Sequence, residues 1–91
     1  MYYVYVLKSS TKNWYYIGLT NNFKRRFTQH NLGKSPSTKA YHPFTLIYTK
    51  PFSDRISARD YEKFLKIRSN KEKLIKSIYE SRSDGTSRTS L

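Results

Sequence analysis

The 91-residue sequence contains no cysteine, and it has no long uninterrupted apolar run. Without cysteine, neither a disulfide framework nor a thiolate zinc site can form. No segment approaches the length of a membrane-spanning helix, and residues 1–8 lack the charged and long apolar regions of a signal peptide. We therefore expect a single small domain in the cytoplasm, without membrane contact.

The first half of the chain also lacks negative charge. The first carboxylate is Asp54, and the net charge of the chain is +12. The basic residues that precede it are Lys8, Lys12, Lys24, Arg25, Arg26, Lys34, Lys39 and Lys50. Charge of one sign over half the chain attracts polyanions, so nucleic acid is the expected partner.

Carboxylates are scarce in the whole chain, which has six Asp and Glu residues. A two-metal nuclease gathers several carboxylates around its ions, and six scattered acids do not provide such a centre. One carboxylate with water and substrate oxygens could still hold one ion, an arrangement that suits Mg²⁺. The two histidines form neither a zinc motif nor part of a Ser-His-Asp set.

Aromatic and β-branched residues are abundant, and they indicate the strands. We expect strands over 2–8, 14–20 and 44–49, the last bracketed by Pro43 and Pro51, which cannot donate to a ladder. Helices are expected from about 23 to 31, from about 54 to 68, and after 69. The order β-β-α-β-α-α predicts an α/β domain over residues 1–80, with a small, three-stranded, mainly antiparallel sheet flanked by helices.

Local signals define the ends and connections of these elements. Thr20, Asn21 and Asn22 are candidate N-caps for the first helix, and Gly33 is a stop signal. Residues 33–42 indicate a basic, mobile loop, and 81–91 a disordered tail. In the third helix, Ser69 and Glu72 have the spacing of a capping box, and the buried stripe is Leu74, Ile75, Ile78 and Tyr79.

Two tyrosines and a glycine are candidate site residues on the first two strands. Tyr5 and Tyr16 fall on neighbouring strands, where an aromatic pair can simply stabilise the sheet. A phenol has a pKa of about 10, and a guanidinium close to it would favour the phenolate. Gly18 would let a phosphate or a neighbouring group approach the backbone, or it is only a glycine at the end of a strand.

Arg26 and His30 lie one helical turn apart, on a face that borders the apolar stripe of the first helix. Lys24 and Arg25 point away from that face, toward solvent. At the edge of the core, Arg26 needs an anionic partner, which could be Glu62 or a phosphate. His30 is either a hydrogen-bonded imidazole of structural importance or a participant in chemistry.

The second helix has two competing apolar stripes. If Ala58, Tyr61 and Leu65 face the sheet, Glu62 is a carboxylate at the edge of the core. If Ile56, Phe64 and Ile67 do, Glu62 is an ordinary surface acid. Periodicity leaves both open, and the third helix could cover the Phe64/Ile67 side. If it does not, that stripe could be a dimer surface.

Taken together, these residues resemble a known family. Tyr3-Val4-Tyr5 and Tyr16-Ile17-Gly18, with Arg26 and His30 after them and Glu62 in a later helix, are similar to the GIY-YIG nuclease superfamily. The most similar members are small single-domain proteins like the N-terminal nuclease domain of the DNA-repair excinuclease. The resemblance covers about residues 2–79. One departure is Tyr3, which stands where the family has its first Gly, a backbone position that fold and activity should tolerate.

The resemblance implies an endonuclease that hydrolyses DNA in repair or recombination, using one Mg²⁺ or Mn²⁺ ion. It assigns Glu62 to the metal, Arg26 to the scissile phosphate, and Tyr5, Tyr16 and His30 to the attacking water, and it favours the Ala58/Leu65 face as the inward one. Lys24, Arg25, Lys34 and Lys39 would contact the DNA backbone. A homodimer or a partner protein would supply targeting. The alternative is a nucleic-acid-binding module of the same fold with little or no cleavage. An RNA-recognition fold is disfavoured by the element order.

Overall fold

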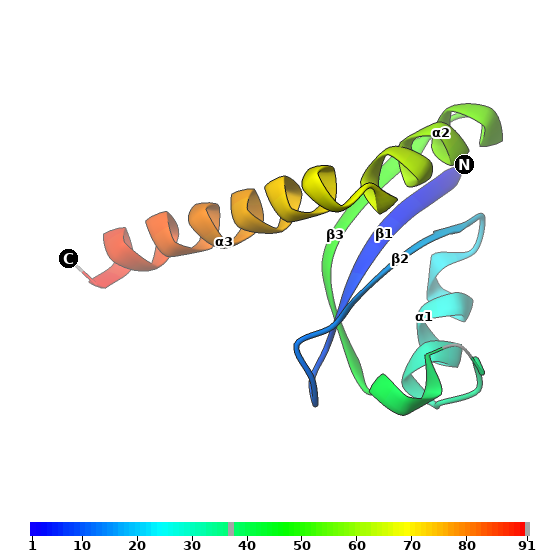
Figure 1. The fold of residues 1–91 in the computed structure, drawn as a ribbon, viewed down its shortest axis with the longest axis horizontal. Coiled ribbons are helices and arrows are strands. Elements are labelled where there is room, and N and C mark those ends of the chain that lie inside the picture. The colour runs from blue at the N-terminus through cyan, green and yellow to red at the C-terminus, as the bar shows by residue number, and fades with distance from the viewer. Residues whose placement is uncertain (37, 91) are drawn as a thin grey trace.

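The computed structural model describes residues 1–36 and 38–90, with side chains described up to residue 80. The elements are β1 (Tyr2–Ser9), β2 (Tyr15–Thr20), α1 (Phe23–Asn31), the 3₁₀ helix η1 (Lys39–Tyr41), β3 (Phe44–Phe52), α2 (Arg55–Lys66) and α3 (Arg68–Ser90). Apart from the short η1, this is the predicted order β-β-α-β-α-α (Figure 1). The predicted tail, 81–91, falls outside the residues whose side chains are described and stays a prediction.

The sheet has three antiparallel strands with β1 in the middle, in the order β2-β1-β3. Tyr5 of β1 therefore has neighbours on both sides, pairing with Gly18 of β2 and Thr49 of β3. The prediction that the third strand stops before Pro51 is wrong, because β3 continues to Phe52. β3 is an edge strand, and an edge position tolerates a residue without an N–H.

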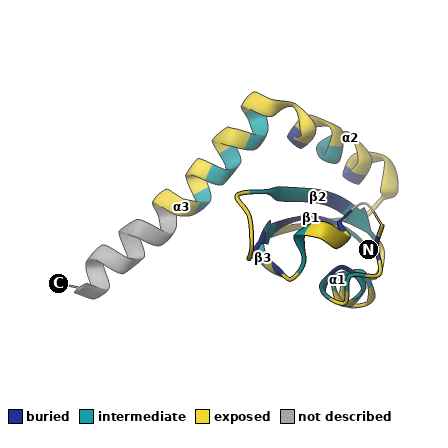
Figure 2. Ribbon diagram, turned by 60° about the horizontal axis from the view of Figure 1, so that its bottom comes forward, coloured by how far each residue is buried: buried dark blue, intermediate teal, exposed yellow. Residues whose placement is uncertain are grey.

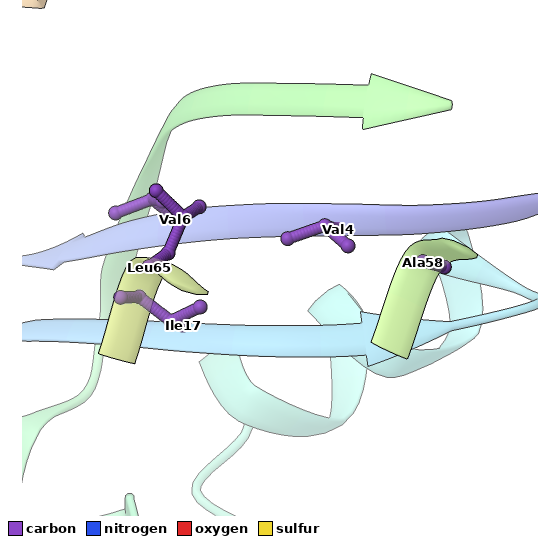
Figure 3. Packing of buried hydrophobic residues seen from close by; sticks show 5 residues of the cluster. All are labelled: Val4, Val6, Ile17, Ala58 and Leu65. Carbon is purple, nitrogen blue, oxygen red and sulfur yellow. The ribbon is translucent and has the colours of Figure 1, made fainter. Parts of the chain in front are cut away.

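Helices cover both faces of the sheet, with α2 on one side and α1 on the other (Figure 2). Alternation along β1 sends Val4 and Val6 toward α2, where they pack with Ile17, Ala58 and Leu65 (Figure 3). A second cluster, built on Tyr5, Leu7 and Phe44, packs under α1 against Phe23 and Phe27. Two thin cores therefore share one three-stranded sheet.

The inward face of α2 is the Ala58/Leu65 stripe. Ala58 is 0% exposed and Leu65 is 1% exposed, whereas Ile56, Phe64 and Ile67 are 76%, 50% and 56% exposed. Of the two possibilities that the sequence left open for the Phe64/Ile67 side, the structure therefore shows the one in which the third helix does not cover it. α3 turns away from α2 soon after it begins (Figure 1) and leaves that stripe to solvent.

α3 packs less tightly than its sequence pattern indicates. Leu74, Ile75 and Ile78 are only half-buried, and Tyr79 is exposed, so the prediction of a fully buried stripe is wrong. The helix still contacts the domain, because Leu74 packs against the α2-side core. The hydroxyl groups of Tyr79 and Tyr15 also form a hydrogen bond of 3.1 Å.

The ends of α1 and α2 follow their sequence signals. Asn22 caps α1 by accepting from the backbone N–H of Arg25, and Asp54 caps α2. Gly33, at φ 71°, closes α1 with the two backbone hydrogen bonds of a Schellman motif. The predicted capping box of α3 is wrong, because the helix begins at Arg68 and Ser69 lies inside it. The Glu72 carboxylate pairs with the Arg68 side chain at 3.1 Å instead.

Two residues of the segment after Gly33 are packed into the domain, and the mobility of this segment stays a prediction. Ser35 and Thr38 are buried, and η1 follows directly. The Tyr41 carbonyl accepts a hydrogen bond from Ser9 Oγ at 2.7 Å, which joins the segment to the end of β1. Within the described part of the chain, no helix is both long and apolar enough to cross a membrane.

Replacing Leu65 by Ala should lower the free energy of unfolding by about 2–5 kcal/mol, because it leaves a cavity in the α2-side core. The matched control is Ile56→Ala on the exposed side of the same helix, which should change it by less than about 0.5 kcal/mol. Urea unfolding followed by circular dichroism measures both. Equal losses in the two variants would contradict the assigned orientation of α2.

Candidate active site

Four of the five predicted catalytic side chains lie together between α1 and the sheet. β1 contributes Tyr5 and β2 contributes Tyr16, with their ring centroids 6.2 Å apart. α1 contributes Arg26 and His30, and the His30 ring lies 4.8 Å from the Tyr16 ring. Strand alternation and the helical repeat thus bring these side chains to one place.

Gly18 makes room for the phenol of Tyr5. A Cβ at this position would collide with Cζ and Oη of Tyr5, and it would lie 2.9 Å from Cε2 of Tyr16. Real Cβ atoms essentially never approach other atoms so closely, so any side chain here would displace the tyrosines. Of the two sequence-based interpretations, the structure supports the close approach, and the approaching group is Tyr5.

His30 is fully buried, and both of its ring nitrogens have partners. Nε2 lies 3.2 Å from Tyr5 Oη, and Nδ1 lies 2.8 Å from Thr38 Oγ1. Burial, reinforced by the positive charge of Arg26, lowers the pKa of His30 from 6.5 to about 4. The imidazole is therefore neutral at pH 7, and its Nε2 faces the hydroxyl of Tyr5, which is itself only 1% exposed.

Tyr5 is protonated at neutral pH. Burial raises its pKa to about 12, and the neighbouring Tyr16 adds to the increase. Arg26 acts in the opposite direction through a hydrogen bond and its charge, but it does not outweigh burial. The expectation that the guanidinium would favour the phenolate identified the correct interaction and underestimated the cost of removing the phenol from water.

Arg26 is half-buried and interacts with both phenols. Burial alone would lower its pKa, but hydrogen bonds to Tyr16 and Tyr5 raise the pKa above its usual value. Its Nη1 also donates to Gln29 Oε1 at 3.3 Å. Within the described residues Arg26 makes no ion pair, so the structure does not contain the salt bridge to Glu62 that the sequence allowed.

Glu62 lies apart from the other four, on the helix that covers the opposite face of the sheet. Its side chain is 14% exposed, and its carboxylate pairs with Lys66 at 3.4 Å and Arg59 at 3.9 Å. It lines a hollow of about 410 Å³ together with Thr20 and Asn21 at the end of β2. Its charge still contributes, as the smallest cause, to raising the pKa of Tyr5.

The hollow at Glu62 combines oxygen groups of the kind that a hard divalent cation binds with the guanidinium groups of Arg55 and Arg59. Carboxylate, hydroxyl and amide oxygens come from Glu62, Thr20 and Asn21, and the space accommodates water. Across the described residues, no three His, Asp or Glu side chains gather in one place, so any ion here would rely on one carboxylate. Arg59 and Lys66 are more than half exposed, at 55% and 57%, and such surface pairs are weak enough to open.

The four predicted DNA-contacting residues are exposed on α1 or on the segment that follows it. They are Lys24, Arg25, Lys34 and Lys39. Lys24 also lines a shallow, mainly apolar hollow of about 590 Å³ at the start of α1, with Phe23 and Pro51. Exposure fits the prediction that these side chains face solvent, and their contact with DNA stays a prediction.

Thr38 is the member of the site that sequence reasoning missed. It lies in a connection without hydrophobic periodicity, so no pattern marked it as buried. Its position depends on the Schellman turn at Gly33, which directs the chain back over His30. The available signal was a threonine shortly after a candidate histidine, which is too common to single out.

Comparison with known proteins agrees with this geometry. The family model for the GIY-YIG catalytic domain matches residues 1–76. The chain belongs to this family. It is 37% identical over 75 residues to a UPF0213 protein of Limosilactobacillus reuteri, covering 79% of this chain and 77% of the relative. It is 38% identical over 72 residues to a UPF0213 protein of Streptococcus pneumoniae, covering 78% and 72%.

A solved structure also matches the GIY-YIG fold of this chain. The solution NMR structure of a UPF0213 protein from Bacillus halodurans is 32% identical and covers 84% of each chain, with a TM-score of 0.53. The family resemblance stated from the sequence and the predicted fold class are therefore both confirmed.

Replacing Gly18 by Ala should lower the free energy of unfolding by about 1–3 kcal/mol, because the new methyl group overlaps the Tyr5 ring. In a Tyr5→Ala background, the same replacement should cost much less, since the obstructing ring is gone. Urea unfolding of the four proteins in this double-mutant cycle measures the difference. An equal cost in both backgrounds would show that Gly18 does not serve to seat Tyr5.

Stability should fall as the pH is lowered from about 6.5 to 4. In this window the unfolded chain binds a proton at His30 and the folded chain does not, so acid favours unfolding, by up to about 3 kcal/mol. Urea unfolding at stepped pH should show this component in wild type and in His42→Gln, and should not show it in His30→Gln. If His30→Gln keeps the full pH dependence, His30 is not the group responsible.

Proposed function

We propose that this protein is a metal-dependent endonuclease that hydrolyses DNA phosphodiester bonds. Membership of the GIY-YIG catalytic domain family suggests a nuclease. The residues that the family uses are present, and four of them lie in one cluster. Strong positive charge, +12 over the chain, suits a polyanionic substrate.

The observation that carries the proposal is the state of Arg26. It is a half-buried cation beside two phenols, and among the described residues no carboxylate balances it. A guanidinium in such a position favours a planar oxyanion, and phosphate oxygens match its fork of donors. The scissile phosphate fits this requirement and would lie beside both tyrosine hydroxyls.

The chain's residues then have distinct roles. Arg26 binds the phosphate and stabilises the charge that develops on it. The hydroxyls of Tyr5 and Tyr16 hold and orient the attacking water. Glu62, with Thr20 and Asn21 nearby, would hold one Mg²⁺ or Mn²⁺ ion, which when bound supplies Lewis-acid charge to the phosphate oxygens. His30 acts from the interior, through Tyr5.

Substrate binding is assigned to the basic residues around α1. Lys24, Arg25, Lys34 and Lys39 contact the DNA backbone without reading its sequence. Targeting to a particular DNA structure, in repair or recombination, would then come from a partner protein or from a homodimer.

A second candidate is a nucleic-acid-binding module of the same fold with little cleavage. The observation that favours it is the ion pairing of Glu62, whose carboxylate oxygens face Arg59 and Lys66. If these pairs persist in solution, the carboxylate is less available to a metal ion. Binding would then depend on the same basic residues, and the cluster at Arg26 would only hold phosphate.

Replacing Glu62 by Gln should lower the rate of DNA cleavage in Mg²⁺ or Mn²⁺ at least about a hundredfold, because the metal ligand loses its charge. The matched control is Glu72→Gln on α3, whose exposed carboxylate pairs with Arg68 among the described residues, and it should cleave like wild type. Branched, single-stranded and duplex DNA are incubated with each protein, with and without the metal ion.

Two further results decide between the candidates. Wild type that binds these DNAs but cleaves none of them under any metal condition would establish the binding module. Cleavage that is equal in wild type and Glu62→Gln would show that the assigned metal ligand is wrong.

A further inference from the structure

Thr38 contacts His30, the most deeply buried member of the cluster of Tyr5, Tyr16, Arg26 and His30. Thr38 is 0% exposed, and its hydroxyl has two partners, His30 Nδ1 at 2.8 Å and the Ser35 carbonyl at 3.5 Å. A carbonyl oxygen can only accept, so Ser35 offers the single hydroxyl proton of Thr38 an acceptor other than His30. With that proton on the Ser35 side, Thr38 Oγ1 accepts from His30, and Nδ1 carries the imidazole proton.

The other end of the cluster leads to the same assignment. Tyr5 is 1% exposed, and among the described residues the partner within hydrogen-bond distance of its hydroxyl is His30. The phenolic proton is then free to point to His30 Nε2, at 3.2 Å. A neutral imidazole carries one N–H, and with Nδ1 protonated, Nε2 is able to accept.

We propose that Thr38 is a positioning residue that fixes the tautomer of His30, with the proton on Nδ1 and a free acceptor at Nε2 facing Tyr5. The hydrogen bonds then run in one direction, from Tyr5 through His30 and Thr38 to the Ser35 carbonyl. In this arrangement the hydroxyl proton of Tyr5, the Nδ1 proton of His30 and the hydroxyl proton of Thr38 each have an acceptor.

The opposite tautomer satisfies fewer groups. With the proton on Nε2, His30 would donate to Tyr5 Oη. Among the described residues, the phenolic proton would then have no acceptor. Thr38 would then donate to Nδ1, and the Ser35 carbonyl would keep the backbone N–H of Thr38 as its donor.

This tautomer lets Tyr5 accept a proton although its phenol is already protonated, because the phenolic proton can move on to His30. As an O–H bond of the attacking water breaks and its oxygen bonds to phosphorus, the released proton binds Tyr5 Oη and the phenolic proton moves to Nε2. The P–O bond to the leaving oxygen breaks, and that oxygen takes a proton from solvent. His30 then returns its proton through Tyr5 to solvent. This role rests on the proposed function, whereas the tautomer does not.

Imidazole ¹⁵N NMR tests the tautomer directly. Two-bond ¹H–¹⁵N correlation spectra of uniformly ¹⁵N-labelled protein at pH 7 distinguish a protonated Nδ1 from a protonated Nε2. The chain has two histidines, so a His42→Gln spectrum assigns the signals of His30. We expect the Nδ1–H tautomer in wild type. The Nε2–H tautomer, or an even mixture, in wild type would overturn the proposal without any variant.

Three variants test the role of the hydroxyl. Thr38→Val removes it at nearly constant shape and should shift His30 toward the Nε2–H form, while Thr38→Ser should retain the wild-type pattern. Thr45→Val makes the same chemical change at an exposed position on β3 and should leave the His30 signals unchanged. A Thr38→Val spectrum like that of wild type would overturn the assignment of Thr38.

Cleavage kinetics test the consequence for the reaction. Thr38→Val should lower kcat by about tenfold to a hundredfold with little change in the Kd for DNA, and Thr38→Ser should largely restore it. A folded Thr38→Val protein with wild-type kcat would overturn the positioning role. If wild type cleaves no DNA, the proposed function fails, and the NMR result still decides the tautomer.

Discussion

The phenol of Tyr5 rests on the backbone of Gly18, and the site is organised around this contact. Tyr5 lies on the central strand, so its position is fixed by pairing on both sides. Because Gly18 has no side chain, the ring can turn over β2 and bring its hydroxyl to His30 and Arg26. Any larger residue at Gly18 would separate the phenol from both partners. Gly18 of the Tyr16-Ile17-Gly18 motif therefore provides the space that Tyr5 of the Tyr3-Val4-Tyr5 motif occupies.

Burial dominates the electrostatics of the cluster. It raises the pKa of Tyr5, lowers that of His30, and so leaves both groups neutral at pH 7. Arg26 keeps its charge because it is only half-buried and donates to two phenols. A lone cation among neutral, hydrogen-bonded groups makes a binding site for an anion. It also means that a phenol here can act on water only if a neighbour takes its proton.

The two faces of the sheet carry different kinds of core. The α1 side holds the polar cluster within an aromatic core, and the α2 side holds an aliphatic core with Glu62 at its margin. Glu62 and Arg26 therefore lie on different helices, and among the described residues no ion pair joins them. The exposed Ile56, Phe64 and Ile67 stripe on α2 points away from both groups.

Sequence alone determined the element order, the alternating faces of β1 and β2, and the pairing of Arg26 with His30 on one side of α1, since all three follow from local periodicity. It also supplied the family through its motifs. Tertiary structure decided what depends on contacts between distant segments. These were the inward face of α2, the extension of β3 through Pro51, the failed capping box at Ser69, and the burial of Thr38 against His30. The balance of burial against charge at Tyr5 belongs here too, because desolvation depends on everything that packs around a group, and periodicity describes only one element at a time.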